Sequence, residues 1–240
     1  MYDMKKERSY WQGPGAANRR IMYIAAGYES EDILEKPHIG IANTFFEGSP
    51  GTGHLRRLAE SVKQGIWMNG GMPMEFGVPA TCGNIATGSN GLRYELAARD
   101  VVAMSIETVV RVHKLDGLVI LASCDNIIAG AYLAAFRAGI PVIVVTGGPM
   151  GAGNYGGKTI VQADVDIAAI KGDTELLDVV EQYVCPSFGA CPSMGTANTM
   201  QILGEALNLV LPGTATIPAA DNLKLRKCVE AGKFIVDLTK

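Results

Sequence analysis

The pattern of apolar and polar positions is most distinctive at residues 118–126, where an apolar run ends abruptly in polar side chains. The run is too short for a helix and is apolar or β-branched throughout, which predicts a strand buried on both faces of a parallel sheet. The next side chains are a thiol, a carboxylate and a carboxamide, those of Cys124, Asp125 and Asn126. Because open α/β sheets bind ligands at the carboxyl ends of their strands, a site is expected here.

The rest of the chain alternates short apolar runs with longer amphipathic segments. Further strands are predicted at residues 38–43, 73–78 and 141–146. Helices are predicted at residues 54–69, 94–114, 130–138, 173–184, 196–211 and 222–238. On the helix at 94–114, charged side chains lie between the apolar ones and are interpreted as its solvated face: Arg93, Glu95, Arg99, Asp100 and Glu107. The pattern therefore predicts an α/β domain with a parallel β-sheet sandwiched between helices.

Residues 1–36 are polar and irregular, with one short helix expected at 21–26, and are predicted to form an N-terminal arm before a domain at 37–240. Such an arm either lies across a partner subunit or is a poorly ordered terminus. Glycine-rich loops are expected at 47–53, 80–91 and 150–159. The first of them opens a helix, where free N–H groups can bind phosphate, but its spacing fits neither the Walker nor the dinucleotide pattern, and a tight turn is the simpler interpretation.

Composition narrows the classes of function. The chain has 240 residues, 48% of them hydrophobic and 19% charged, and a net charge of −3. Without a basic run, nucleic acid and membrane surfaces are not expected as partners. No run of eighteen apolar residues and no signal-peptide core is found, so a cytoplasmic protein is predicted.

The cysteines are the main candidates for chemistry. Five cysteines, an odd number, do not suggest a disulfide framework, and in a reducing compartment they are free thiols or metal ligands. Cys82, Cys124 and Cys191 lie in loops or at strand ends among small residues, whereas Cys185 and Cys228 adjoin apolar helices and are interpreted as buried packing residues. Three thiolates on separate loops suit an iron–sulfur cluster with one iron open to substrate. Spacing alone leaves ordinary free thiols as the alternative.

Four separated segments are more specific: residues 54–60 (HLRRLAE), 99–110 (RDVVAMSIETVV), 117–125 (GLVILASCD) and 185–200 (CPSFGACPSMGTANTM). In this order they resemble the dihydroxy-acid dehydratase and phosphogluconate dehydratase family, from about residue 37 to the last residue. The resemblance implies the fold of the family's N-terminal domain. It also implies a hydro-lyase that converts a 2,3-dihydroxy acid or a sugar acid to a 2-keto acid with an iron–sulfur cluster, [2Fe–2S] or [4Fe–4S], and often Mg²⁺.

The resemblance assigns two cluster ligands directly, Cys124 in the Cys-Asp motif and Cys191 in the Ala-Cys motif. Where dihydroxy-acid dehydratases carry a third cysteine, this chain has Gly51. Cys82 is then the candidate for the third ligand, since some sugar-acid dehydratases of the family carry a cysteine at this point.

The family's magnesium set is also altered. Its aspartate is replaced by Gly83 and its lysine by Asn126, so that only Asp125 remains in this part of the chain, which leaves Mg²⁺ binding open. Asp125 is expected to position a second cation or a substrate hydroxyl, with capping of the following helix as an equal alternative. His54, at a helix start, is expected to be a cap or a packing residue rather than a base.

Members of the family are more than twice this length and complete the active site with a second, β-rich domain. We therefore expect a small subunit, or else a fragment, that is active only with a partner chain carrying the β-rich domain, that forms a hetero- or homo-oligomer, and that exposes apolar surface when alone. Two rival functions remain: a non-catalytic, partner-binding relic of the dehydratase fold, and a lyase acting on a different hydroxy acid.

Overall fold

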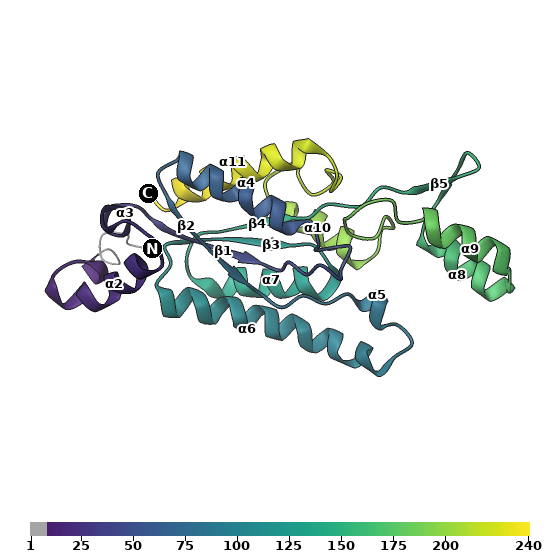
Figure 1. Ribbon diagram of the computed structural model, residues 1–240, viewed down its shortest axis with the longest axis horizontal. Helices are drawn as coiled ribbons and strands as arrows, with labels where there is room; N and C mark the ends of the chain where they lie inside the picture. The colour runs from purple at the N-terminus through teal and green to yellow at the C-terminus, as the bar shows by residue number, and fades with distance from the viewer. Residues whose placement is uncertain (1–8) are drawn as a thin grey trace.

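The computed structural model describes residues 9–240 as three layers, with a parallel sheet between helices (Figure 1). The sheet has the strand order β2-β1-β3-β4, and every neighbouring pair is parallel. The strands are β1 (His38–Asn43), β2 (Met72–Gly77), β3 (Gly117–Ala122) and β4 (Val142–Thr146). Both central strands, β1 and β3, are buried along their whole length, which confirms the buried parallel strand predicted from the apolar run.

Two helices cover each face of the sheet. On one face lie α4 (Leu55–Met68) and α11 (Asn222–Leu238), and on the other α6 (Glu95–His113) and α7 (Asp125–Ala138), with α10 (Thr196–Ala206) beside α7. The apolar stripe of α4 has helical spacing and packs on the sheet through Leu55, Leu58, Val62 and Ile66. The predicted sheet sandwiched between helices is therefore confirmed.

Residues 9–36 are more ordered than their polar sequence indicated. They form two short 3₁₀ turns (Ser9–Trp11 and Pro14–Ala16), α2 (Ala17–Ala25) and α3 (Ser30–Glu35). Trp11 and Ile33 are buried against Met72, and the ring of Tyr23 packs on Trp11 and His38. The short helix expected at 21–26 overlaps α2, but the expectation that the rest of this part is irregular is wrong. Its scattered aromatic residues, which show no periodicity, pack against the sheet. Residues 1–8 of the predicted arm lie outside the described residues.

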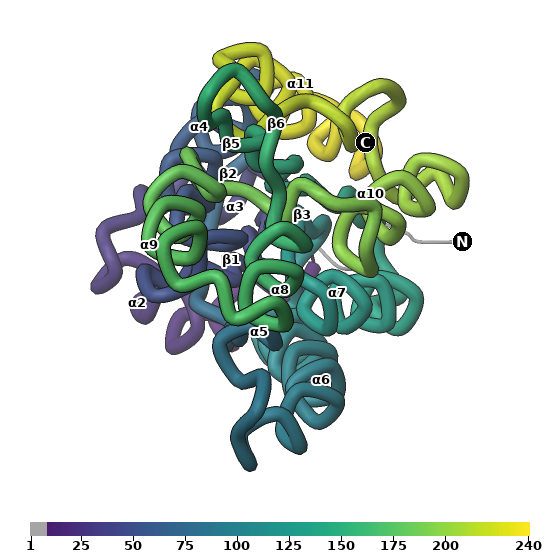
Figure 2. The backbone as a smooth tube through the Cα atoms, turned by 90° about the vertical axis from the view of Figure 1, so that its right-hand side faces the viewer, coloured from purple at the N-terminus to yellow at the C-terminus, as the bar shows by residue number. Residues whose placement is uncertain are grey.

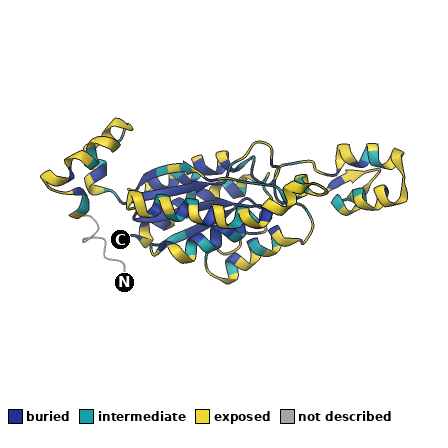
Figure 3. Ribbon diagram, turned by 90° about the horizontal axis from the view of Figure 1, so that it is seen from below, coloured by how far each residue is buried: buried dark blue, intermediate teal, exposed yellow. Residues whose placement is uncertain are grey.

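A second group of elements projects beyond the carboxyl edge of the sheet (Figures 1 and 3). It contains the hairpin of β5 (Gly153–Tyr155) and β6 (Lys158–Ile160), followed by α8 (Gln162–Lys171) and α9 (Thr174–Tyr183). The region expected to be a plain loop is thus a hairpin, turned by Gly156 and Gly157, both at positive φ. The helix α8 was not predicted because only Ala168 in it is buried, so its pattern is barely amphipathic.

Two helix ends also differ from the prediction. The helix α7 begins at Asp125, well before the predicted start at Gly130, so that Gly130 lies inside it. A Cβ at Gly130 would lie 2.5 Å from the Arg99 carbonyl oxygen, so this glycine allows α6 and α7 to pack closely rather than marking a helix start. The helix α10 ends before residue 211 because Asn208 has a left-handed φ of 55°. Within residues 9–240, no helix has the length and apolar character needed to cross a membrane.

The helices α4 and α11 touch through two glycines. A Cβ at Gly65 would lie 2.1 Å from the Val229 carbonyl oxygen, and one at Gly232 would lie 2.3 Å from the Val62 carbonyl oxygen. Backbone therefore packs on backbone at this crossing, which no larger residue permits.

The Gly65→Ala substitution tests this contact. Alanine is normally favoured over glycine inside a helix by about 1 kcal/mol. Here the clash should reverse the sign and lower the free energy of unfolding by roughly 1–3 kcal/mol, as overpacking does. Urea unfolding measures the effect. Gly77→Ala is the control, since a Cβ at Gly77 meets no atom within 4 Å, and an unchanged or raised stability of Gly65→Ala would contradict the close crossing.

Candidate functional site

The candidate site lies at the carboxyl edge of the sheet, which faces the viewer behind α8 and α9 in Figure 2. At this edge β1 ends in Asn43, β3 continues into Ser123 and Cys124, and β4 continues into Gly147. Cys124 occupies the N-cap position of α7 and is 7% exposed. The parallel topology thus delivers the polar residues after each strand to one place, as the sequence predicted.

Cys82 and Cys124 form the centre of the site. Cys82 lies just before the single-turn helix α5 (Gly83–Ala86), and its sulfur is within hydrogen-bonding reach of Cys124. Because the Cys124 thiol donates to it, the pKa of Cys82 falls to about 6. The same contact, together with burial, raises the pKa of Cys124. Cys82 is therefore the sulfur of the pair that loses its proton more readily.

Cys191 lies on a loop that backbone hydrogen bonds attach to this edge. The Gly189 N–H donates to the Pro50 carbonyl (2.8 Å), and the Ala190 N–H donates to the Gly148 carbonyl (2.9 Å). The loop is thus tied both to the glycine-rich loop before α4 and to the turn after β4. Burial and the charges of Cys82 and Asp125 raise the pKa of Cys191. The Cys191 thiol is therefore close enough to Cys82 and Asp125 to be affected by their charges.

The three thiols predicted to converge are brought to one edge but are not closed into a finished metal site. Among residues 9–240, no three His, Cys, Asp or Glu side chains are grouped so as to hold a metal ion. Cys228 is buried (1% exposed) between α11 and the sheet, as predicted. Cys185 is exposed, so its interpretation as a buried packing residue is wrong; it follows α9 in the projecting group, where little is buried.

Several buried polar atoms at this edge have no hydrogen-bond partner among the described residues. They are Asn43 Oδ1, Ser49 Oγ, His54 Nδ1, Thr81 Oγ1, Ser123 Oγ and Thr146 Oγ1. Buried hydroxyl and amide groups are rarely left unpaired unless water, an ion or a ligand contacts them. Thiols that can ligate iron and hydroxyls that can hydrogen-bond to a cluster therefore lie at the same edge of the sheet. These types of side chain are the ones that an iron–sulfur cluster requires.

The glycine-rich loop before α4 forms a tight turn. The N–H groups of Thr52 and Gly53 both donate to the Ser49 carbonyl oxygen, at 3.1 and 2.8 Å, so they face into the loop rather than toward an anion. A Cβ at Gly51 would lie 3.1 Å from the Cys124 sulfur. A side chain at this position would therefore contact Cys124 directly, which is consistent with a cysteine ligand there in other members of the resembled family.

Two carboxylates flank the thiol pair. Asp125 begins α7 half-buried, and no side chain caps that helix, so the capping alternative is not observed. Glu95 begins α6 and is only 7% exposed. Its carboxylate accepts a hydrogen bond from the Asn126 side-chain N–H at 3.3 Å and lies 3.5 Å from the Cβ position of Gly83. Assigning Glu95 to a solvated face was wrong, because the first turn of α6 faces the start of α7.

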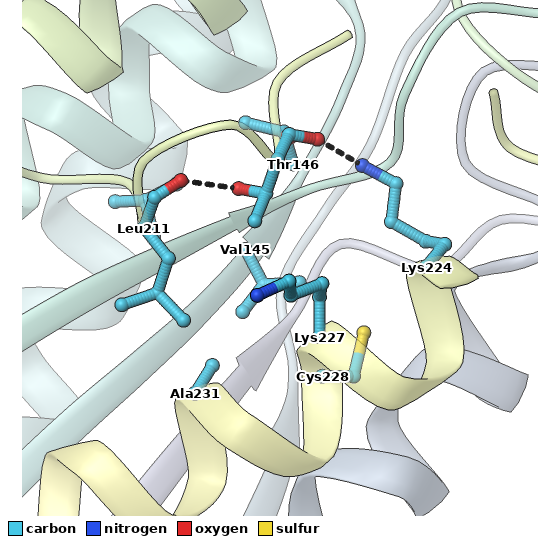
Figure 4. Close-up of a pocket in the computed structure, with 9 residues that line it drawn as sticks. Val145, Thr146, Leu211, Lys224, Lys227, Cys228 and Ala231 are labelled. Atoms are coloured by element: carbon cyan, nitrogen blue, oxygen red, sulfur yellow. Dashed lines mark hydrogen bonds between the residues drawn. The ribbon is translucent and has the colours of Figure 1, made fainter. Parts of the chain in front are cut away.

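Two buried basic residues, a histidine and a lysine, support the turn after β4. His54 contacts the Gly147 carbonyl through Nε2 (2.9 Å) and stacks on Phe188, and burial lowers its pKa; it is a packing residue, as expected. Lys224, 1% exposed, donates to the Thr214 carbonyl (2.7 Å; dashed line from Lys224 in Figure 4), and burial lowers its pKa to about 8. Its Cε lies 3.0 Å from the Cβ position of Gly148. Sequence alone missed Lys224, because a lysine on an amphipathic helix is normally exposed.

Comparison with known proteins agrees with this architecture. The sequence model of the family described as dihydroxy-acid/6-phosphogluconate dehydratase N-terminal matches residues 36–240. The chain is 42% identical over 234 residues to the dihydroxy-acid dehydratase of Halothermothrix orenii, covering 95% of this chain and 42% of that protein. The chain is 43% identical over 234 residues to the dihydroxy-acid dehydratase of Pyrococcus furiosus, covering 95% of this chain and 42% of that protein. It is 42% identical over 226 residues to the dihydroxy-acid dehydratase of Methanococcus maripaludis strain C7, covering 92% of this chain and 41% of that protein. The chain spans less than half the length of these curated relatives.

The thiol pair predicts an unusual pH profile of alkylation. In the reduced, metal-free chain, the reaction of Cys82 with iodoacetamide should rise through about pH 6 and level off above it, because only the thiolate reacts. Peptide mass spectrometry measures the rate at each cysteine. Cys185 is the internal control, since burial raises its pKa and its reaction should begin at higher pH. Cys124→Ala should move the Cys82 profile to higher pH, and an unmoved profile would show that Cys124 does not lower the pKa of Cys82.

Proposed function

Because the chain belongs to the dihydroxy-acid and 6-phosphogluconate dehydratase family, we propose that it is the cluster-binding part of a hydro-lyase that dehydrates a 2,3-dihydroxy acid or a sugar acid to a 2-keto acid. The observation that carries the proposal is the contact of Cys82 with Cys124 beside the anchored Cys191 loop. In the proposal, Cys82 supplies the third ligand in place of the family cysteine that is Gly51 in this chain.

In the proposal, Cys82, Cys124 and Cys191 hold an iron–sulfur cluster in the reducing cytoplasm, where such thiols stay free. When bound, the cluster supplies a Lewis-acidic iron that stabilises the hydroxide leaving the substrate. The lowered pKa of Cys82 favours this role, since thiolates rather than thiols ligate iron. Counting iron and sulfide distinguishes [2Fe–2S] from [4Fe–4S].

The chain's own residues bind and orient the acid. Dehydration removes the C2 proton and the C3 hydroxyl as water and leaves an enol that tautomerises to the 2-keto acid. Asp125 lies next to Cys124 and is the residue we assign to a substrate hydroxyl or to a second cation such as Mg²⁺. The buried hydroxyls at this edge, such as Ser123 Oγ, can orient the bound groups. The base that removes the C2 proton is assigned to the part of the relatives that this chain does not cover.

We further propose that a second chain or a second copy of this chain covers the site. Large apolar side chains are exposed just before α6 and along its outer face: Leu92, Tyr94, Leu96, Val101, Met104 and Val112. Apolar surface of this kind is uncommon on soluble monomers. A covering partner would also exclude water from the cluster.

Anaerobic reconstitution with iron and sulfide tests the cluster. The wild-type chain should become brown, with close to stoichiometric iron and sulfide. Alanine at Cys82, Cys124 or Cys191 should weaken iron binding by more than the roughly 10–100-fold that loss of an outer-shell partner costs. Cys185→Ser, at an exposed thiol, is the matched control. A colourless wild-type protein would favour the non-catalytic relic, and full iron retention in Cys82→Ala would remove Cys82 from the ligand set.

Sedimentation velocity tests the partner. Alone, the chain should self-associate in a concentration-dependent way, because the apolar face of α6 is otherwise exposed to water. Met104→Lys, in the middle of that face and 63% exposed, should shift the distribution toward monomer, whereas Glu230→Lys, at an exposed position of α11 on the other face of the sheet, should not. A monomer that dehydrates a polyhydroxy acid at full rate without any second chain would contradict the proposal.

A further inference from the structure

Two carboxylates are buried among the described residues, and they differ in their surroundings. Asp116 is 2% exposed and accepts a hydrogen bond from the His38 backbone N–H (2.7 Å), which holds the start of β1. Glu95 is 7% exposed and lies at the opposite edge of the sheet, the edge that carries the thiols. Asp116 therefore has a clear structural task, and Glu95 needs another explanation.

The position of Glu95 is defined by two neighbours of the thiol pair. Asn126, two residues after Cys124, donates its side-chain N–H to Glu95 Oε2 (3.3 Å). Gly83, the residue after Cys82, has no side chain, and its Cβ position lies 3.5 Å from the same oxygen. The carboxylate thus lies on the α6–α7 flank of the thiol pair, in space that a side chain at residue 83 would otherwise occupy.

The carboxylate has few compensating contacts. No lysine or arginine among residues 9–240 forms an ion pair with Glu95, and its single side-chain hydrogen bond, from Asn126, is long. A carboxylate has only acceptor sites, so the remaining lone pairs of Glu95 need donors. Leaving a buried charge so poorly compensated is costly unless a ligand supplies the missing contacts.

We propose that Glu95, together with Asn126, binds a substrate hydroxyl beyond C3 and thereby selects sugar acids over dihydroxy acids with alkyl tails. The inference rests on the proposed function and adds the substrate class. Glu95 accepts the hydroxyl proton, and the Asn126 carboxamide offers a second N–H to the hydroxyl oxygen. An alkyl tail offers neither contact and would leave the carboxylate desolvated.

The expected discrimination follows from this asymmetry. Sites built to bind a hydroxyl reject analogues that lack it far more strongly than apolar pockets reject an extra methylene. One hydrogen bond to a charged group corresponds to roughly 10–100-fold in binding. The chain should therefore prefer a linear hexonic acid to a branched dihydroxy acid that has no hydroxyl beyond C3, although the relatives compared above are named dihydroxy-acid dehydratases.

The test compares two probes, D-gluconate and 2,3-dihydroxy-3-methylbutanoate, with the full chain reconstituted anaerobically with iron and sulfide. Calorimetry gives the binding ratio of the two acids, and turnover, with any chain that co-purifies, gives the ratio of kcat/KM. Wild type should favour gluconate by at least about tenfold. Glu95→Gln keeps the shape but removes the charge and should lower this ratio, and Glu95→Leu should abolish it while leaving the binding of the branched acid unchanged or improved. Asp100→Asn, on the exposed side of the same helix, is the control and should retain the wild-type ratio.

Two kinds of result would overturn the inference. Equal binding of both acids by wild type, or a ratio that Glu95→Leu leaves unchanged, would remove Glu95 from substrate selection. A loss of Mg²⁺ binding in Glu95→Gln with an unchanged ratio would make it a cation ligand instead. A chain that takes up no iron would end the proposed function, but the binding ratio measured on that chain would still decide the role of Glu95.

Discussion

The hydrogen bond between the Cys124 and Cys82 sulfurs is the interaction on which the rest of the site depends. It joins the end of a central strand to a loop that follows an edge strand, and it lowers the pKa of Cys82. A parallel sheet makes this possible, because it directs the residues after every strand to the same edge. The contact also explains how a chain that has glycine at residue 51 still gathers thiols at this edge.

The third thiol depends on a different kind of support. The Cys191 loop has no strand or helix of its own and is held by backbone hydrogen bonds to the Pro50 and Gly148 carbonyls. The turn that contains Gly148 rests in turn on buried Lys224. The position of Cys191 thus depends on α4, β4 and α11 together, so that a change in the packing of those helices should be felt at the site.

The sequence predicted the layers, the strands and the edge where the site lies, because burial on both faces leaves an unbroken apolar run in β3 that no surface element shows. It could not predict the surroundings of Glu95 or Lys224, since a charged residue on a helix is normally solvated and only tertiary packing shows otherwise. Gly130 was misread for a related reason: a glycine inside a helix and one at its start look alike until the neighbouring helix is placed. The aromatic contacts of Trp11 and the weakly amphipathic α8 have no periodic signal at all.

The most direct test of the account is a crystal structure of the chain reconstituted and crystallised without oxygen. The account predicts one cluster at the carboxyl edge of the sheet, with iron bonded to the sulfurs of Cys82, Cys124 and Cys191, and with Glu95 beside the open side of the cluster. A cluster bound through Cys185 or Cys228, or a disordered Cys82 with no iron between the thiols, would contradict it.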